Sequence, residues 1–535
     1  MLLFEIFFLD FLMFASYYAN VIAFDAVSNC AIISLTDVIG LFPEIFLAFS
    51  LLFLLFHGTL VSSNSANNFP LIQNSICNIS FFILLLTFIL LFQVNFTVET
   101  FFFNNTVVID PLSIFSKMFV VSSSFCLLLI IKPYLSTQQI NSFEYCLLLL
   151  LSVFGLLFLC SSNDLMTAYL CIEVQSLSFY LLAAYKKNSV FSVDAGLKYF
   201  ILGSFSSALF LLGSSIIYGS TGTFNFADLK DLFLFTPVTF EILSFKSLSA
   251  QFLELKLVNF GIACILISLF FKLAIAPFYV WSPDVYEGSL TSSTIFFAII
   301  PKLSLFVFLI RFLNGSLSTF MEIWKPLIVL IGVFSVFIGS FVGLEVRKIK
   351  TLLAYSSVSH MGYAILAYST NCFAGNLTVI YYLIIYIITS VCIWSIVIIF
   401  KSKNTYSQKT NKDLSDFSSL GKSHLTISVF FTMFLLSLSG FPPLIGFYAK
   451  VQVFLILMEK ELFFAGSLAI LFSAVSTFYY IRIIKTLFFE KNFTGSLFYP
   501  LNYYESLIIT TGFFAIVFFF INPNILYLIC YKMCF

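Results

Sequence analysis

Residues 266–281 read LISLFFKLAIAPFYVW, and residues 436–450 read LSLSGFPPLIGFYAK. Each is an apolar run that contains one lysine, Lys272 or Lys450. The breaker in the first run is Pro277, and the breakers in the second are Gly440, Pro442, Pro443 and Gly446. A broken helix in lipid persists only where its freed backbone groups line a cavity or contact protein. We therefore expect two broken membrane helices, with a kink used only for packing as the alternative.

The composition of the whole chain points to lipid as its solvent. Of its 535 residues, 61% are hydrophobic and 10% are charged. In soluble domains, roughly a quarter of the residues are charged. A soluble globular protein is therefore excluded. The formal net charge of +1 provides no basic surface for nucleic acid. The 11 cysteines are scattered without a Cys-x-x-Cys pair, which argues against a disulfide scaffold or a zinc site.

Apolar segments long enough to cross a bilayer recur along the chain. A hydrocarbon core of about 30 Å requires about 20 apolar residues in a helix. We count about fourteen such segments, at 41–62, 77–97, 111–131, 142–161, 164–185, 195–219, 257–279, 290–313, 326–344, 350–370, 374–400, 425–458, 462–486 and 504–531. Residues 1–40 form a hydrophobic N-terminal extension that carries no Lys or Arg and resembles neither a signal nor a transit peptide. The sequence predicts an all-α polytopic membrane protein.

The basic residues of the loops support this count. Lys and Arg accumulate in short loops on the side from which a membrane protein is inserted. Loops after even-numbered helices hold five of them. Loops after odd-numbered helices hold thirteen: Lys132, Lys186, Lys187, Arg347, Lys348, Lys350, Lys401, Lys403, Lys409, Lys412, Lys422, Lys485 and Lys491. We call the side of the odd loops the positive side and expect it to be the matrix or cytoplasmic side.

Ionisable residues inside apolar segments are the candidate functional residues. Glu173, Lys272, Lys302 and Lys450 lie within or beside spans, and Lys198 lies near the start of the sixth span. A charge near the bilayer centre costs about 2.5–3.5 kcal/mol on insertion scales, so such residues are usually functional. The alternatives are lysines that reach the headgroups with their long side chains and a paired structural carboxylate.

One carboxylate and several lysines on different helices can hold and pass protons. Each lysine changes its protonation state in response to the charge of its neighbour. His360, in TLLAYSSVSHMGYAIL, can relay a proton because imidazole titrates near neutral pH. A histidine that only forms hydrogen bonds between helices is the alternative. The pattern indicates proton translocation.

With these segments identified, the chain resembles the subunit 2 family of NADH:ubiquinone oxidoreductase (respiratory complex I), the mitochondrial counterpart of the bacterial N subunit and a member of the antiporter-like subunits. The resemblance runs from about residue 41 to about residue 490 and rests on several long motifs in order. These are LFPEIFLAFSLLFLLFHG, IEVQSLSFYLLAAYKKNSVFSVDAGLKYFILGSFSSALFLLGSSIIYGSTG, FKLAIAPFYVWSPDVYEG, IKTLLAYSSVSHMGY and LSLSGFPPLIGFYAK.

The resemblance implies two inverted five-helix repeats, helices 4–8 and 9–13, each with a broken helix at Pro277 or at Gly440 to Pro443. The domain boundaries it implies are 1–40 for the extension, 41–140 for helices 1–3, 141–315 and 316–490 for the two repeats, and 491–535 for helix 14.

Site roles are also implied by the resemblance. Glu173 is expected to be a fifth-helix carboxylate that pairs with Lys272, Lys302 an eighth-helix connector, and Lys450 a twelfth-helix lysine toward the exit side. Lys198 matches a sixth-helix lysine.

One position departs from the family pattern. Where bacterial relatives read Phe-His-x-Trp-x-Pro-Asp, this chain has Tyr279 in place of the histidine, in FYVWSPD. A phenol exchanges a proton less readily than imidazole near neutral pH. Transfer between Lys272 and Lys302 is then expected to depend more on bound water or on His360.

The sequence and the resemblance together predict a proton-translocating membrane-arm subunit of complex I. NADH, FMN, iron–sulfur clusters and ubiquinone are expected in the rest of the complex, because no motif for them is present in this chain. The expected partners are other membrane-arm subunits, including other antiporter-like ones, and membrane lipids, with no nucleic acid. The 74 Phe suggest an AT-rich, organelle-encoded gene and a location in the mitochondrial inner membrane. A free-standing cation/proton antiporter subunit and a purely structural membrane subunit are the alternatives.

Overall fold

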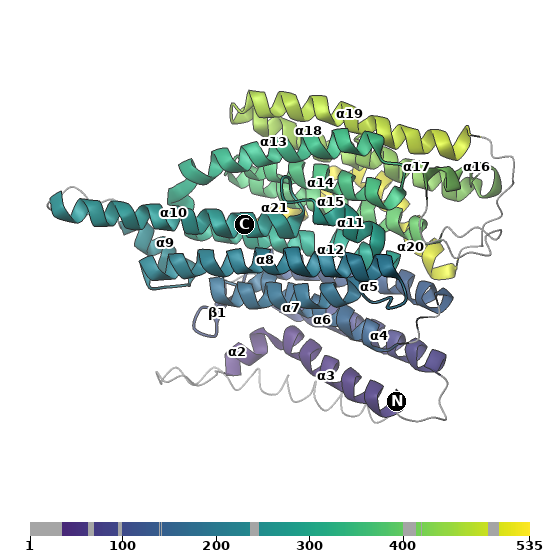
Figure 1. The fold of residues 1–535 in the computed structure, drawn as a ribbon, viewed down its shortest axis with the longest axis horizontal. Helices are drawn as coiled ribbons and strands as arrows, with labels where there is room; N and C mark the ends of the chain where they lie inside the picture. The colour runs from purple at the N-terminus through teal and green to yellow at the C-terminus, as the bar shows by residue number, and fades with distance from the viewer. Residues whose placement is uncertain are drawn as a thin grey trace.

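Long helices run side by side in this computed structural model, with their axes close to one common direction (Figure 1). The structure describes residues 35–62, 69–94, 99–138, 140, 142–235, 245–399, 413–418, 420–490 and 502–534. Most of the N-terminal extension, residues 1–34, lies outside them, as does the start of the region assigned to helix 14. Helix α3 (Phe42–Ser62) lies at one edge of the bundle and α19 (Phe463–Phe488) at the other.

The first half of the chain supplies the N-terminal helices and the first repeat. The N-terminal elements are α2 (Leu35–Gly40), α3, α4 (Phe69–Gln93), β1 (Thr100–Phe102), β2 (Val107–Ile109) and α5 (Pro111–Thr137). The first repeat contains α6 (Glu144–Ser161), α7 (Leu165–Ala183), α8 (Val190–Thr221), α9 (Phe226–Phe235), α10 (Phe245–Leu273), α11 (Trp281–Gly288) and α12 (Thr291–Ile310), which continues as the π-helical turn η1 (Arg311–Ser316).

The second half supplies the second repeat and the C-terminal helices. After the short turn η2 (Ser318–Phe320), the repeat contains α13 (Met321–Glu345), α14 (Ile349–Tyr368), α15 (Phe373–Ile399), η3 (Leu414–Phe417), α16 (Leu420–Ser423), α17 (Leu425–Ser439), α18 (Ile445–Glu459) and α19. The chain then forms α20 (Tyr503–Ile521) and α21 (Pro523–Cys534).

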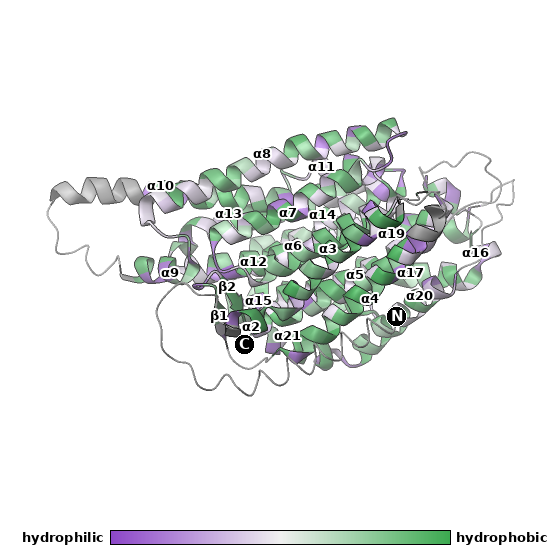
Figure 2. Cartoon of the chain, turned by 90° about the horizontal axis from the view of Figure 1, so that it is seen from below, coloured by the Kyte–Doolittle hydropathy of each residue, from purple (hydrophilic) through white to green (hydrophobic). Residues whose placement is uncertain are grey.

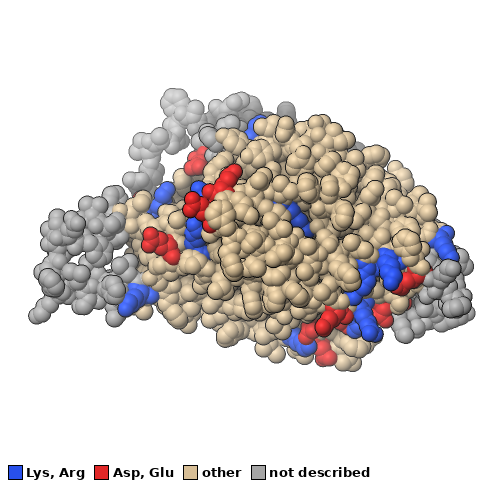
Figure 3. All heavy atoms as spheres, turned by 90° about the horizontal axis from the view of Figure 1, so that it is seen from above, with Lys and Arg blue, Asp and Glu red and all other residues tan. Residues whose placement is uncertain are grey.

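The expected polytopic helical architecture is confirmed. Within the described residues, twelve helices are long and apolar enough to cross a membrane. Helix α14 and the broken pair α17–α18 are the two further expected spans. The helix surfaces are mainly apolar (Figure 2), and on the face in Figure 3 most charged side chains gather toward the two ends.

Both expected helix breaks are present. The seventh span stops at Leu273 and resumes as α11, while the twelfth stops at Ser439 and resumes as α18. Side chains satisfy carbonyl groups that the breaks free, as lipid requires. Trp281 Nε1 donates to the Phe271 carbonyl at 2.8 Å, and Lys450 Nζ donates to the Ser439 carbonyl at 2.7 Å.

Helices α12 and α15 occupy the middle of the bundle. Every residue of α12 is buried, and α15 is buried along nearly all of its span. A helix that is apolar all round is suited to such a position. Because α12 belongs to the first repeat and α15 to the second, their contact joins the two repeats.

Three local features differ from the sequence prediction. The expected fourteenth helix, 504–531, is divided between α20 and α21, because Pro523 lacks a backbone N–H and disfavours a helical conformation at Asn522. A small antiparallel hairpin, β1–β2, interrupts the all-α pattern. The expected loop 220–256 contains α9 and the first turns of α10.

Candidate functional site

Lys302 lies at the contact between the two repeats. Its side chain is 3% exposed, and its Nζ donates to the hydroxyl of Tyr386 on α15 at 3.0 Å. The ammonium also lies 4.8 Å from the centre of the Tyr386 ring, within cation–π range. Among the described residues, no carboxylate forms an ion pair with Lys302. A neutral hydroxyl and an aromatic ring are therefore its immediate polar surroundings.

His360 is held between hydroxyl groups from two other helices. Its Nδ1 lies 2.6 Å from the hydroxyl of Tyr382 on α15, and its Nε2 lies 3.1 Å from the hydroxyl of Tyr480 on α19. The imidazole ring centre is 5.5 Å from that of Tyr386, which binds Lys302. A neutral imidazole can donate through one nitrogen and accept through the other, so His360 can receive a proton on one side and release one on the other.

The ammonium group of Lys450 is bound at the break in the twelfth span. The Ser439 carbonyl that accepts from Lys450 lies in the last turn of α17, where the helix dipole favours a positive charge. Gly440 ends this helix with a φ of +85°, a left-handed conformation that suits glycine. The ammonium also lies 5.4 Å from the centre of the Tyr363 ring.

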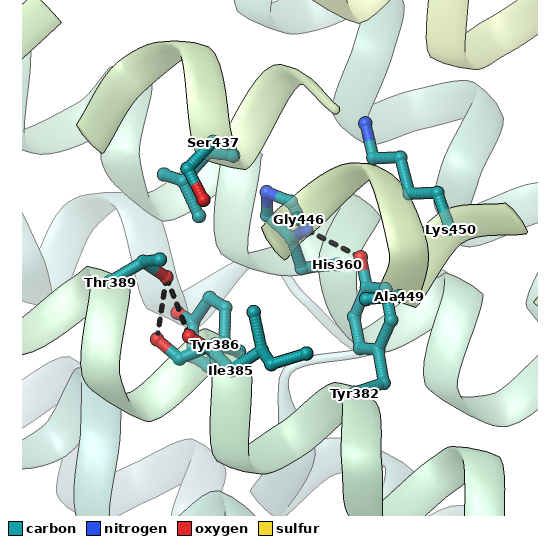
Figure 4. Close-up of a pocket in the computed structure, with 10 residues that line it drawn as sticks. His360, Tyr382, Ile385, Tyr386, Thr389, Ser437, Gly446, Ala449 and Lys450 are labelled. Atoms are coloured by element: carbon teal, nitrogen blue, oxygen red, sulfur yellow. Dashed lines mark hydrogen bonds between the residues drawn. The ribbon is translucent and has the colours of Figure 1, made fainter. Parts of the chain in front are cut away.

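A small cavity connects these groups. His360, Tyr386 and Lys450 line it, together with residues of α15, α17 and α18 (Figure 4). Its volume is about 10 Å³, about the space that a single water molecule requires. Figure 4 shows His360 between the helix that carries Tyr382 and Tyr386 and the helix that carries Lys450. The cavity therefore provides a short polar route from the partner of Lys302 to Lys450.

Lys272 contacts a tyrosine rather than the expected carboxylate. Its Nζ donates to the hydroxyl of Tyr180 on α7 at 3.2 Å, and no ion pair joins it to Glu173, although both residues are described. Tyr180 follows Glu173 by seven residues, which is about 10 Å along a helix. Glu173 Oε1 is buried and has no hydrogen-bond partner in the part of the chain that the structure describes. Tyr180 thus provides the polar contact of Lys272, and Glu173 lies about two turns away along α7.

Tyr279, the residue that replaces histidine, does not join the two lysines. Its ring lies 5.9 Å from that of Tyr355 on α14, and Tyr279 itself lies in the break between α10 and α11. Between the partner of Lys272 and α12 the contacts are aromatic: Tyr180 packs on Tyr199 at 4.8 Å, and Tyr199 lies 5.9 Å from Phe297.

Lys198 lies apart from the other site residues. It is 58% exposed on the outer face of α8 and pairs with the 52% exposed Asp284 at 2.5 Å. In the sequence, Lys198 lies in an apolar segment. In the structure, it lies on a face of α8 that points away from the bundle. The expected role of Lys198 in a buried line is therefore not supported by its position.

The tyrosines of the site were not identified from the sequence. Tyr382 and Tyr386 are four residues apart and so share one face of α15, which is the available signal. With 26 Tyr and 74 Phe in the chain, that signal does not stand out from ordinary aromatic packing.

A buried ion pair near the N-terminal helices was also not identified from the sequence. Lys117 on α5 and Glu44 on α3 form an ion pair at 2.5 Å, with exposures of 2% and 1%. Nearby, Arg311 forms two hydrogen bonds with Asp110, at 2.7 and 2.8 Å. The two partners of each pair lie far apart in the sequence, so no local motif predicts them.

Comparisons with known proteins agree on one family. The model of the family described as NADH:quinone oxidoreductase/Mrp antiporter, TM, matches residues 162–478. NADH-ubiquinone oxidoreductase chain 2 of Marchantia polymorpha is 34% identical over 93% of this chain and 98% of its own length. NADH-quinone oxidoreductase subunit N of Pelagibacter ubique is 35% identical over 84% of this chain and 89% of its own.

Solved structures share the fold. A chain of respiratory complex I from Thermus thermophilus superposes with a TM-score of 0.72 at 23% identity, covering 91% of this chain and 98% of that one. A chain of the Mrp complex from a Dietzia species gives 0.73 at 16% identity, covering 92% and 96%. The chain belongs to the chain 2/subunit N family of NADH:quinone oxidoreductase, within the antiporter-like transmembrane subunits.

Proposed function

We propose that this chain moves protons across the membrane as one module of a respiratory complex I, driven by electron transfer in other subunits. The observation that carries the proposal is the buried connection from Lys302 through Tyr386 and His360 to Lys450. Uncompensated buried cations are costly to a fold. Lys450 lines a water-sized cavity, and Tyr386, the hydrogen-bond partner of Lys302, lines it too, which supports a transport role.

Each group has a defined role in the proposed transfer. Lys302 releases a proton to the Tyr386 hydroxyl, which at the same time releases its own proton toward His360. His360 takes up that proton on one ring nitrogen while it releases one from the other. A water molecule in the cavity carries the proton on to Lys450. Each step breaks one N–H or O–H bond and forms another, so one proton is gained for each one lost. The Ser439 carbonyl holds the protonated Lys450.

Glu173 and Lys272 act in the first repeat. When Lys272 is protonated, the carboxylate of Glu173 attracts the Lys272 ammonium away from the Tyr180 hydroxyl, to which it is hydrogen-bonded in this structure. Movement of the Lys272 ammonium between Tyr180 and Glu173 alters the electrostatic potential at Lys302. Lys272 is thus a switch that controls when Lys302 gives up its proton.

The proposed setting is the mitochondrial inner membrane, with an organelle-encoded, multi-pass chain. Other membrane-arm subunits and lipids cover its apolar faces, and NADH oxidation and ubiquinone reduction occur elsewhere in the complex. The names of its chain 2 relatives support this setting.

The test is the number of protons moved per electron pair by the whole complex in sealed vesicles. Lys302→Met and Lys450→Met are expected to lower this ratio while NADH oxidation in uncoupled vesicles persists. Lys422→Met, which removes an exposed lysine on α16, is the matched control. Unchanged ratios in both buried variants would contradict the proposal.

A free-standing cation/proton antiporter subunit is the second candidate, favoured by the fold shared with the Mrp complex. Purification distinguishes the two. A complex I subunit co-purifies with NADH:quinone activity, whereas an antiporter subunit separates from it. A purely structural role predicts instead that the buried variants fail to assemble and that any assembled complex pumps normally.

A further inference from the structure

Lys350 is a buried lysine at the positive side that the proposed route does not use. It is the second residue of α14 and is 5% exposed. Its Nζ donates to the carbonyl of Ser289 at 2.9 Å, and among the described residues it forms no ion pair. From the sequence alone, Lys350 is expected in a loop. A buried ammonium held by one neutral carbonyl is costly unless it has a further use.

A carboxylate at the surface lies near Lys350. Glu287, at the end of α11, pairs with Lys348, and it also acts electrostatically on Lys350. Glu287 is 30% exposed and Lys348 is 41% exposed, so both reach solvent. Glu287 therefore stands between the positive-side surface and the buried amine.

Hydroxyl groups continue inward from Lys350. Tyr286, next to Glu287 in the chain, is 1% exposed, and Ser357 lies seven residues, or about two turns, after Lys350 on the same face of α14. The Ser357 hydroxyl donates to the Ala354 carbonyl at 2.8 Å and also interacts with Tyr286 and Tyr386. Tyr386 accepts the hydrogen bond of Lys302. A row of three hydroxyls, those of Tyr286, Ser357 and Tyr386, thus ends at Lys302 and begins about two helical turns from Lys350.

We propose that Glu287 and Lys350 form the proton-uptake gate of this subunit on its positive side. Glu287 takes a proton from water and passes it to the neutral amine of Lys350. The carboxylate then holds the Lys350 ammonium in place of Lys348. Lys350 next gives one proton to the row of hydroxyls that ends at Lys302, and Glu287 returns to Lys348. One proton leaves the positive-side water for each proton that reaches Lys302, and only O–H and N–H bonds change.

This inference rests on the proposed function, because it supplies the proton that Lys302 releases. Its sharpest variant is Lys350→Arg. Arginine keeps the charge and can donate to the Ser289 carbonyl, but it does not give up its proton. A structural role for Lys350 therefore predicts normal pumping with arginine, whereas a gate predicts loss of pumping in an assembled complex.

The experiment measures protons per electron pair for Lys350→Arg, Lys350→Met, Glu287→Gln and Lys302→Met in the whole complex in sealed vesicles, with Lys422→Met as the exposed control. We expect Lys350→Arg to assemble and to lower the ratio as much as Lys302→Met does, with Glu287→Gln lowering it less. A normal ratio for Lys350→Arg beside a lowered one for Lys302→Met overturns the gate and leaves the proposed function standing. Normal ratios for Lys302→Met and Lys450→Met overturn the proposed function itself.

Discussion

Lys302 on α12 and Tyr386 on α15 form a 3.0 Å hydrogen bond that crosses from one five-helix repeat to the other. The lysine forms no ion pair with a carboxylate of the described residues, and the tyrosine hydroxyl accepts its hydrogen bond. Because both helices are buried throughout the site, this bond is shielded from solvent and lipid. This phenol therefore provides a buried polar connection between the repeats at Lys302.

Tyr386→Phe is expected to remove that connection. The loss of the hydroxyl leaves the buried Lys302 ammonium without its acceptor, at a cost of about 1–3 kcal/mol. The proton ratio of the complex should fall while the complex still assembles. Tyr381→Phe is the matched control on the same helix, because the Tyr381 hydroxyl is buried and has no hydrogen-bond partner among the described residues. Equal pumping by the two variants would count against a role for Tyr386.

Gly446→Ala is expected to push the two halves of the broken span apart. A Cβ at Gly446 would overlap the carbonyl oxygen of Ser437 and lie 2.7 Å from its carbon. Both atoms belong to the α17 backbone, so α18 must shift and the cavity around Lys450 must change. Pumping should be lost more than assembly, as measured by the proton ratio and by native gel electrophoresis. Gly219→Ala meets no atom within 4 Å and should leave both unchanged.

Breaking the Glu44–Lys117 ion pair is expected to destabilise the N-terminal helices. Lys117→Met leaves a buried carboxylate without its counter-ion, which costs about 3–5 kcal/mol. The double variant Glu44→Gln with Lys117→Met should recover part of that loss, because no unpaired charge remains. Thermal unfolding of the purified complex measures both. A double variant less stable than Lys117→Met would show that the pair does not act as described.

Lys198→Met is expected to have little effect on the proton ratio. The lysine lies on the outer face of α8, paired with Asp284, away from the cavity lined by His360 and Lys450. Vesicle measurements should place this variant close to the exposed control Lys422→Met. A fall in the proton ratio as large as that of Lys302→Met would show that Lys198 belongs to the proton route.

The fold was largely predictable because lipid imposes strong rules on sequence. Apolar length marked the spans, and Pro277 and Gly440 marked the two breaks, since helix breakers in lipid are conspicuous. The division of the last helix at Pro523 was missed, because the flanking residues are apolar on both sides.

The candidate site was predictable only in part. Lysines such as Lys302 stand out in apolar runs because a buried charge is costly, but their partners do not. The Tyr386 hydroxyl, the position of Lys198 on the outer face and the burial of Lys350 depend on which helices pack together. Periodicity within one helix gives no information on such contacts between helices.

The proposed passage of protons from Lys302 to Lys450 depends most on His360, the group between them. The most direct test is the number of protons moved per electron pair by a His360→Gln complex in sealed vesicles. Glutamine can still form hydrogen bonds with Tyr382 and Tyr480, but it cannot take up a proton near neutral pH. We predict a ratio lowered as far as that of Lys302→Met, with NADH oxidation retained when the vesicles are uncoupled. A ratio equal to that of the unaltered complex would contradict the account.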